Sequence, residues 1–453
     1  MRPAFIKELE DILGPGQVRE DRETRQAVAL DPEALPDAVV FPQDSEQVAR
    51  VVSWAGKEGI PLIPWGAGKH AFRGLLPLRG GIVINLTGLQ KVLEFDQDNQ
   101  TAYVEAGLSL AQLKEIFGAG RLFLPLDPVE GEACTLGGCI ASHASGPRKL
   151  GYGTIKDYLL GLEVVLPTGE VVRTGGKTVK NVQDYDNTRF LAGSWGALGI
   201  ITKAMLKLKP LPEKEVTMVL GFNALDEACE AAYTLRKEWG PVALELLDSR
   251  TLTALENIGS PLPGEGKERL VVAFAGFAEA VDWQVDQVVA RFGSRARINI
   301  YTNTEAQAVW EARRKAFAAF SGEKGGLLGQ VSLPFTSTGK FITEVDKFIS
   351  SKEVKAGIVA HFGNGHVHVF IEHPPLAYSE VRGFLAGIEE QALKEGGLFL
   401  VDNVGDLEDI RKKVENRGSA LLPLLKRIKE ALDPKGILAP NSKAIAYALS
   451  PRG

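Results

Sequence analysis

The chain has 453 residues, of which 45% are apolar and 24% charged. These proportions are typical of a globular protein, and the length is too great for one hydrophobic core, so two or three domains are expected. The formal net charge of −5 is small. No stripe of arginine and lysine with interleaved aromatic residues occurs, which argues against a nucleic acid partner.

The first residues and the cysteines indicate the cellular compartment of the protein. Phe5, Ile6, Leu9 and Ile12 recur at helical spacing among charged residues, which differs from a signal peptide. No run approaches the 18 apolar residues of a membrane-spanning helix. We expect a cytoplasmic protein that reaches the inner face of a membrane only through a partner. Three cysteines exclude a disulfide framework, and they exclude an iron–sulfur cluster held by this chain alone, which normally needs four thiolates.

The first predicted elements form a strand–helix–strand unit. Residues 38–41 are apolar and predict a strand, Asp44 and Ser45 open a helix, and residues 61–63 predict the next strand. The second strand delivers the chain into residues 64–81, which contain five glycines.

Further along, a helix is predicted over residues 108–118, where Ser109 is a suitable N-cap. Residues 127–157 contain six glycines and show no hydrophobic period, so they predict a long loop. Loops of that length in compact domains are usually functional. A hairpin is predicted around residues 168–169, and the proline- and lysine-rich residues 209–214 indicate a domain boundary.

The second half mixes helices, predicted over 226–239 and 305–320, with apolar strands over 269–277, 357–362 and 366–372. This mixture indicates an α+β domain with an antiparallel sheet. A last amphipathic helix is stopped by the Asp-Pro pair at 433–434.

The glycine-rich residues 64–81 have two interpretations. Bare backbone beside Lys69, His70 and Arg73 can turn successive amides toward an anion, which would form a phosphate cradle. An ordinary loop is the alternative, and this stretch alone does not decide between them. It has neither the G-x-G-x-x-G spacing of a nicotinamide dinucleotide site nor the Gly-Lys-Ser/Thr of a P-loop, so both of those are disfavoured.

Two more glycine clusters follow, at residues 135–138 and at Gly146 and Gly151. A long flavin dinucleotide needs several backbone contacts, which separate loops can provide. Here the chain resembles the FAD-binding domain of the vanillyl-alcohol oxidase superfamily, in the branch of glycolate oxidase large subunits and D-lactate dehydrogenases. The resemblance covers nearly the whole chain, and it rests on residues 64–68, 134–182, 193–202 and 431–440.

This resemblance implies an α+β fold in four parts. These are a helical segment at 1–35, a two-subdomain PCMH-type FAD-binding domain at 36–212, a substrate-binding α+β cap domain at 213–420, and a C-terminal helix and tail at 421–453 that packs back on the FAD domain. The cap domain is expected to contain the antiparallel sheet.

The resemblance also assigns cofactor contacts. Residues 66–70 and 135–138 would wrap the FAD pyrophosphate, the flavin and ribose would lie near Ser142, Gly146, Gly151 and Asp157, and the adenine near Ile200 and Ile201. Non-covalent FAD is expected, because His70 lies one position away from the histidine that anchors flavin in some relatives. Cys134 and Cys139 are expected to be small buried thiols with no base nearby in the sequence. The full set of implied cofactor residues is Trp65, Gly66, Ala67, Gly68, Lys69, His70, Thr135, Leu136, Gly137, Gly138, Ser142, Gly146, Gly151, Asp157, Ile200 and Ile201.

The residues alone, without the family resemblance, predict a histidine-rich hairpin. Asn364 and Gly365 form a two-residue turn signal between apolar strands, which would place His361 opposite His368 with His366 on the same face. Imidazoles so placed can share a divalent metal. The alternative is an exposed hairpin face with polar side chains.

The same hairpin resembles the family's His-x-Gly-Asp-Gly-Asn-Leu-His segment. The resemblance implies that His361, His368 and Asp402 hold a divalent metal such as zinc or iron that touches the substrate. The family's general base corresponds to Asn403, which cannot accept a proton as a neutral base. His366 is then the best local candidate, because an imidazole titrates near neutral pH.

Residues 309–320 resemble the family's Trp-x-x-Arg segment, which assigns Trp310 and Arg313 to it. Arg313 would bind the substrate carboxylate with two parallel hydrogen bonds. The alternative is that Arg313 belongs to a solvated helix face.

Together these residues predict an FAD-dependent dehydrogenase of a small D-2-hydroxy acid, D-lactate or glycolate. His366, Arg313 and Asn403 are the catalytic positions, and hydride would pass to flavin N5. Electrons would leave through a partner, an iron–sulfur subunit or an electron-transfer flavoprotein, in a homo- or hetero-oligomer. The alternatives are a non-catalytic FAD-carrying subunit of such a complex, and a flavin protein acting on sugars or phenols.

Overall fold

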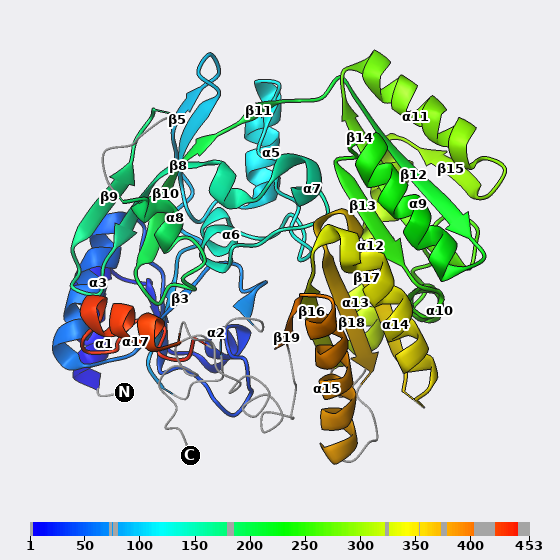
Figure 1. Cartoon of the computed structure of the whole chain (residues 1–453). Helices are drawn as coiled ribbons and strands as arrows, with labels where there is room; N and C mark the ends of the chain where they lie inside the picture. The colour runs from blue at the N-terminus through cyan, green and yellow to red at the C-terminus, as the bar shows by residue number, and fades with distance from the viewer. Residues whose placement is uncertain are drawn as a thin grey trace. The chain divides into compact units, whose positions relative to one another are not determined.

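The computed structural model describes residues 3–71, 75, 80–178, 185–321, 326–352, 354–372, 378–402 and 422–442. It folds as two compact units (Figure 1). Unit 1 comprises Met1–Gly146, Gly153–Leu211 and Gly418–Gly453, and unit 2 comprises Pro147–Tyr152 and Pro212–Arg417. No helix within these described ranges is long and apolar enough to cross a lipid bilayer.

The first sheet of unit 1 has the order β1-β2-β4-β3, with parallel pairing of β2 and β3 to β4. The predicted strand–helix–strand unit is present, because α3 connects β2 to β3. Asp44 caps α3 by accepting a hydrogen bond from the Gln47 amide, and α3 buries Val48, Val51 and Val52. The bounds are α1 (Pro3–Leu13), β1 (Val18–Arg19), α2 (Arg22–Ala27), β2 (Ala38–Val40), α3 (Ser45–Glu58), β3 (Leu62–Trp65) and β4 (Ile82–Asn85).

The second sheet of unit 1 is antiparallel and has the order β5-β6-β10-β8-β9. The hairpin predicted around residues 168–169 joins β8 to β9. The helix predicted from residue 108 is α5, which begins after Ser109 with a reciprocal capping box to Gln112. The bounds are β5 (Val92–Asp96), β6 (Thr101–Glu105), α5 (Leu110–Ala119), β7 (Leu122–Phe123), β8 (Leu159–Val165), β9 (Val171–Gly175), α8 (Asn187–Leu191), β10 (Ile200–Lys207) and β11 (Lys209–Pro210).

The stretch predicted as one long loop, residues 127–157, is instead partly helical. It contains α6 (Leu136–Ser142), α7 (Lys149–Tyr152) and the 3-10 turn η1 (Ile155–Asp157). These helices are too short to show a hydrophobic period, and two glycines in the first turn of α6 lower its helix propensity. The prediction of a structureless loop was therefore wrong.

The C-terminal part of unit 1 packs around one buried lysine. Helix α17 (Leu422–Leu432) ends just before Asp433, and the Lys429 ammonium donates to that carboxylate at 2.6 Å. The ammonium also donates to the backbone carbonyls of Ala197 and Leu438. Leu438 in turn forms a parallel bridge with Leu62 of β3. One cation thus holds α17, the chain before β10 and the edge of the first sheet together.

Unit 2 is built on an eight-stranded sheet of order β15-β12-β14-β13-β17-β18-β16-β19, in which every neighbouring pair is antiparallel. This confirms the predicted α+β class with an antiparallel sheet. The bounds are β12 (Lys214–Phe222), β13 (Ala243–Leu247), β14 (Glu268–Gly276), β15 (Arg297–Tyr301), β16 (Gly326–Ser332), β17 (Ala356–His361), β18 (His366–Glu372) and β19 (Leu398–Asp402).

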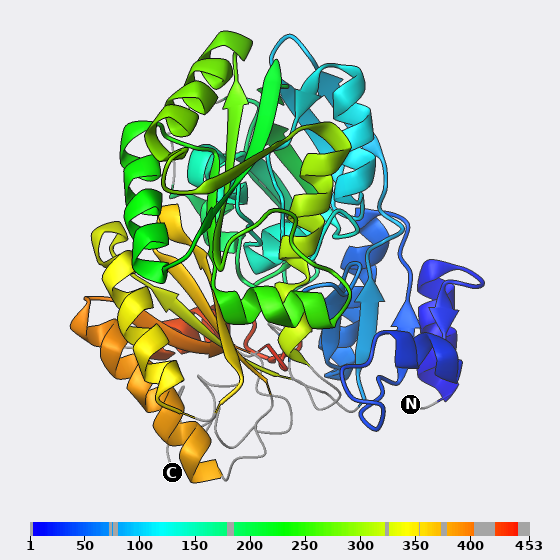
Figure 2. The same cartoon turned by 90° about the vertical axis from the view of Figure 1, so that its right-hand side faces the viewer.

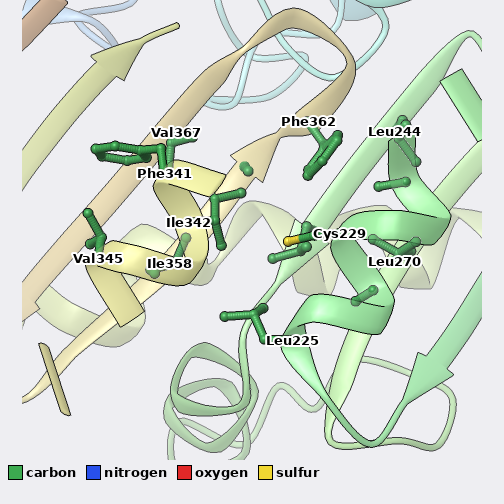
Figure 3. Close-up of a cluster of buried hydrophobic side chains, with 14 of the residues drawn as sticks. Leu225, Cys229, Leu244, Leu270, Phe341, Ile342, Val345, Ile358, Phe362 and Val367 are labelled. Carbon is green, nitrogen blue, oxygen red and sulfur yellow. The ribbon is translucent and has the colours of Figure 1, made fainter. Parts of the chain in front are cut away.

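Helices cover both faces of this sheet (Figure 2). One face buries a large apolar core under α9 (Leu225–Glu238), α11 (Ala278–Phe292), α14 (Thr338–Ser350) and α15 (Tyr378–Lys394). Figure 3 shows side chains of α9 and α14 gathered over this face. The second face packs on α10 (Ser249–Asn257), α12 (Asn303–Arg314) and α13 (Ala316–Ser321). The second face also carries the polar residues described below.

Candidate functional site

A pocket of about 740 Å³, counting space open to solvent, lies inside unit 1. Its wall comes from the turn after β3, the start of α6 and the residues that lead into β10. Twelve of the residues assigned to the cofactor line it: Trp65, Gly66, Ala67, Gly68, Lys69, His70, Thr135, Gly137, Gly138, Ser142, Ile200 and Ile201. Trp195 and Gly196 also line the pocket and had not been assigned.

Two of these glycines allow the segments to touch. A Cβ on Gly66 would lie 2.2 Å from the Thr135 hydroxyl oxygen, and one on Gly137 would lie 2.9 Å from the Ala106 Cβ. Thr135 is the N-cap of α6 and accepts a hydrogen bond from the Gly138 amide. Backbone without side chains therefore forms part of the wall, which lets a dinucleotide approach main-chain amides closely there.

Four assigned cofactor residues lie elsewhere. Leu136 is fully buried in the apolar core of unit 1, and Gly146 packs against the Asp127 carbonyl. Asp157 accepts a hydrogen bond from the Thr154 amide and so stabilises a local turn. Gly151 belongs to unit 2, where its amide donates to the Val242 carbonyl. None of these four lines the pocket.

A polar cluster of four side chains adjoins the pocket. His70 Nδ1 lies 3.2 Å from Glu130 Oε2, and His70 Nε2 lies 4.0 Å from Cys139 Sγ. Burial disfavours the charged ring, but hydrogen bonds with Cys134 and Glu130 raise the pKa of His70 to about 9. A hydrogen bond from Cys139 and the neighbouring His70 lower the pKa of Cys134 to about 6, against the effect of burial. The two thiols are buried as expected, and the fold brings to them a base, His70, that is distant in the sequence.

In unit 2, polar residues form a row across four strands on the second face of the sheet. Glu245 of β13 pairs with His361 of β17, His361 pairs with His366 of β18, and His366 pairs with Ser332 of β16. His368 lies in the next row, and its ring centroid is 5.2 Å from that of His361.

The hairpin register differs from the predicted one. His361 pairs with His366 rather than His368, because Phe362–Asn364 form a 3-10 turn and Gly365 adopts a φ of +71°. Phe362 is buried in the core, and the Gly365 carbonyl accepts from the Leu333 amide, so tertiary packing overrides the local two-residue turn. Side chains alternate between the two faces of a sheet, so a shift of two residues leaves each side chain on its predicted face. All three imidazoles therefore still share one face.

Glu245, at one end of the row, contacts two charged or titratable partners. One carboxylate oxygen lies 2.6 Å from His361 Nδ1, and the other accepts a hydrogen bond of 2.8 Å from Arg313 Nε. Glu245 is fully buried, while Arg313 and His361 are 2% and 4% exposed. Burial raises the pKa of Glu245 to about 7, against the opposing charge of Arg313. An ionised Glu245 accepts from His361 Nδ1–H, which makes Nε2 the acceptor nitrogen of that ring.

His366 is a weaker base than expected. Burial and, to a smaller extent, the nearby Lys149 charge lower the pKa of His366 to about 4. Its Nδ1 lies 3.3 Å from the Ser332 hydroxyl. His366 is therefore neutral at pH 7 and is a weak base. Lys149 reaches unit 2 on the short segment Pro147–Tyr152.

The remaining assigned residues divide into three cases. Arg313 lies on α12 and is buried, so the alternative of a solvated helix face is wrong for it. The helix predicted over 305–320 breaks at Lys315 into α12 and α13. Asp402 ends β19 opposite Leu328, and β16 separates β19 from β18. Asn403, Arg73 and the side chain of Asp402 lie outside the described residues.

The predicted metal set is thus incomplete among the side chains that the structure describes. His361 and His368 have no third histidine, cysteine or carboxylate within metal-sharing distance there, and the cluster of that kind is the one at His70, Cys134 and Cys139. The row in unit 2 supplies an oriented imidazole pair, but the described residues do not complete a metal site.

Glu245 could not be assigned from the sequence, although one signal was present. It stands alone in the apolar strand Ala243–Leu247, where a charged residue must be either exposed or paired. Its partners lie 68 and 116 residues away in the chain.

Comparisons with known proteins agree with both units. A profile of FAD binding domains matches residues 36–175, and a profile of the C-terminal domains of FAD linked oxidases matches residues 211–442. Glycolate oxidase subunit GlcD from Bacillus subtilis (strain 168) is 30% identical over 427 residues, which are 90% of this chain and 89% of the relative. D-lactate dehydrogenase from Archaeoglobus fulgidus is 28% identical, over 96% of this chain and 97% of the relative.

Solved structures share the fold. Alkyldihydroxyacetonephosphate synthase aligns with a TM-score of 0.73 at 21% identity, over 98% of this chain and 85% of that one. p-Cresol methylhydroxylase aligns with a TM-score of 0.74 at 19% identity, over 97% and 96%. The PCMH-type fold inferred from the resemblance is confirmed. The chain therefore belongs to the FAD-linked oxidases, the family of glycolate oxidase subunit GlcD and the D-lactate dehydrogenases.

Proposed function

We propose that the chain oxidises a small D-2-hydroxy acid, of the size of lactate or glycolate, to the 2-oxo acid, with FAD bound in the pocket of unit 1. The names of its relatives support this substrate class. When bound, FAD supplies the acceptor for the two electrons that leave the substrate carbon as hydride. The chain must then remove the hydroxyl proton and hold the substrate carboxylate.

The observation that carries the proposal is the buried series Arg313–Glu245–His361 on the second face of the sheet. A catalytic imidazole accepts the proton on one nitrogen while a carboxylate orients the ring through the other. Glu245 holds His361 Nδ1, and Arg313 holds Glu245. We assign the proton-accepting role to His361 rather than to His366, since the low pKa of His366 makes it a poor base.

Positive charge near the row comes from two residues. Lys149 and Arg313 both act electrostatically on Glu245. Because Arg313 is buried and already faces Glu245, its first role is to position that carboxylate. Lys149, which is half-buried, is the better placed of the two to attract a substrate carboxylate.

Electrons then leave through a partner protein. The three cysteines are too few for an iron–sulfur cluster of the chain's own. An iron–sulfur subunit or an electron-transfer flavoprotein is the proposed acceptor, and the relative from Bacillus subtilis carries the name of a subunit.

The second candidate is an FAD-carrying subunit that relays electrons without oxidising a hydroxy acid. The burial of Arg313 against Glu245 favours this candidate, because that pairing leaves less of the guanidinium for a substrate. The two candidates differ in whether a hydroxy acid alone reduces the flavin.

The test compares His361→Asn with the wild type in anaerobic stopped-flow reduction of the bound flavin by D-lactate and by glycolate. The variant should retain FAD and lose roughly 10²-fold or more in the reduction rate constant. His143→Asn is the matched control, since His143 has a φ of +53°, a conformation that asparagine tolerates, and it lies in unit 1. Equal rates in both variants would reject the role of His361.

A further inference from the structure

The cluster of His70, Cys134 and Cys139 has no role in the reaction proposed above. Cys134 lies one residue before the N-cap of α6, and Cys139 lies in the first turn of that helix. A side chain before an N-cap and one in the following turn commonly contact each other. His70 comes from the turn after β3 and completes the group. Local helix geometry therefore brings the two thiols together, and the glycine-rich turn adds the imidazole.

Cys134 and Cys139 belong to the apolar core of unit 1, and His70 brings a polar ring against them. A ring nitrogen of His70 and the two sulfur atoms all lie within 4.8 Å of one another, and the residues are 8%, 1% and 0% exposed. In a tetrahedral zinc site with Zn–S of about 2.3 Å and Zn–N of about 2.0–2.1 Å, ligand atoms are about 3.5–3.8 Å apart. Small side-chain rotations would suffice to reach those separations.

The fourth residue, Glu130, makes the assignment more specific. It faces Nδ1 of His70, the ring nitrogen that points away from the sulfur atoms. A metal-bound histidine characteristically donates its second nitrogen to a carboxylate, which fixes the ring and raises its basicity. The remaining cysteine, Cys229, belongs to the core of unit 2 and is not part of this group (Figure 3).

We propose that His70, Cys134 and Cys139 bind one thiophilic divalent cation, with zinc as the cation of choice, and that Glu130 is the positioning residue of His70. Two thiolates and one imidazole form a set that selects zinc over magnesium or calcium. His70 and Cys134 also line the pocket, which leaves the fourth position of the ion to water or to a group bound in the pocket. Binding releases the thiol protons.

The site has a consequence for the flavin. Both ring nitrogens of His70 are used, one by the metal and one by Glu130. We therefore expect that acid precipitation releases all of the FAD from the protein, because His70 has no nitrogen left for a covalent bond.

The test is zinc analysis and zinc-edge X-ray absorption on the full-length protein, purified under reducing conditions and exchanged against zinc chloride. We expect one zinc per chain with two sulfur neighbours at about 2.3 Å and nitrogen at about 2.0–2.1 Å. Cys139→Ser should lose the zinc, Cys229→Ser should keep it, and Glu130→Gln should weaken zinc binding about 10–100-fold in competition with a chelator. Circular dichroism would establish that the variants fold.

Four results would overturn the proposal. The first is protein that retains no zinc. The second is zinc without sulfur neighbours, which would place the ion at His361 and His368. The third is a Cys134–Cys139 disulfide in protein purified without a reductant. The fourth is flavin that stays attached to a His70 peptide after acid treatment.

Discussion

Replacing Gly66 by alanine tests whether contact between two backbone segments builds the FAD pocket. The new Cβ would lie 2.2 Å from the Thr135 hydroxyl oxygen and 3.4 Å from its Cβ. An unstrained contact is about 3.5 Å, so the turn or Thr135 must move by about 1 Å. Overpacking of this kind costs about 1–3 kcal/mol. If Thr135 rotates away, the loss of its N-cap hydrogen bond adds about 1 kcal/mol.

The penalty should fall on FAD binding. The apoprotein can relieve the overlap by letting the turn after β3 move away, whereas the cofactor needs both segments in place. A penalty of about 2 kcal/mol corresponds to a roughly 30-fold rise in the dissociation constant. Titration of apoprotein with FAD, followed by flavin fluorescence, measures it. Gly118→Ala is the control, because a Cβ there meets no atom within 4 Å. If Gly66→Ala binds FAD as tightly as Gly118→Ala does, the two segments do not form the pocket as described.

Three further predictions concern buried charges. The Glu163 carboxylate is 1% exposed and contacts Lys203 Nζ at 2.8 Å. Glu163→Gln should therefore lower the free energy of unfolding by about 3 kcal/mol near neutral pH. The control variant Glu94→Gln, at the surface, should lower it by at most about 1 kcal/mol. Despite burial, hydrogen bonds from Lys203 and Ser45 lower the pKa of Glu163 from 4.5 to about 2. The contribution of Glu163 to the free energy of unfolding is therefore complete above pH 4.5 and is lost as the pH falls toward 2. Urea unfolding that gives a constant difference between variant and wild type across this pH range would contradict this. Lys429→Met should lower the midpoint of thermal unfolding by several degrees, because Asp433 loses its cation. Lys426 is half-exposed, so the control variant Lys426→Met should unfold at the same temperature as the wild type. Equal midpoints for the two variants would refute the role of Lys429. Glu245→Gln should keep FAD and slow flavin reduction by a D-2-hydroxy acid roughly 100-fold or more, since His361 loses the carboxylate that orients it; an unchanged rate in stopped-flow would remove Glu245 from the mechanism.

Much of the fold followed from local signals. The capping box at Ser109 and the hairpin at 168–169 each involve residues close in the chain, and both are present. The antiparallel sheet of unit 2 followed from apolar strands mixed with amphipathic helices. The predicted two-residue turn at Asn364 and Gly365 was wrong because the burial of Phe362 and a hydrogen bond from Leu333 set the conformation there. Neither contact lies within the four residues of the predicted turn.

The candidate site was predicted less completely, for a similar reason. Glycine-rich segments identified most of the pocket lining, since bare backbone is visible residue by residue. The partners of His361 and of Cys139 were not visible, because Glu245 and His70 lie 116 and 69 residues away in the chain. Lys149 belongs by sequence to a glycine-rich stretch assigned to the cofactor, but it lies in unit 2. Pairing between distant charged residues is set by the tertiary fold, and no local pattern encodes it.

The most direct test of the proposed activity is the absorption spectrum of the purified wild-type protein under anaerobic conditions. We predict a yellow protein with one FAD per chain, whose visible flavin band bleaches when D-lactate or glycolate is added and returns with an electron acceptor. A colourless protein that does not bind FAD would contradict the pocket of unit 1, and a flavin that stays oxidised with every small D-2-hydroxy acid would contradict the role of the Arg313–Glu245–His361 series.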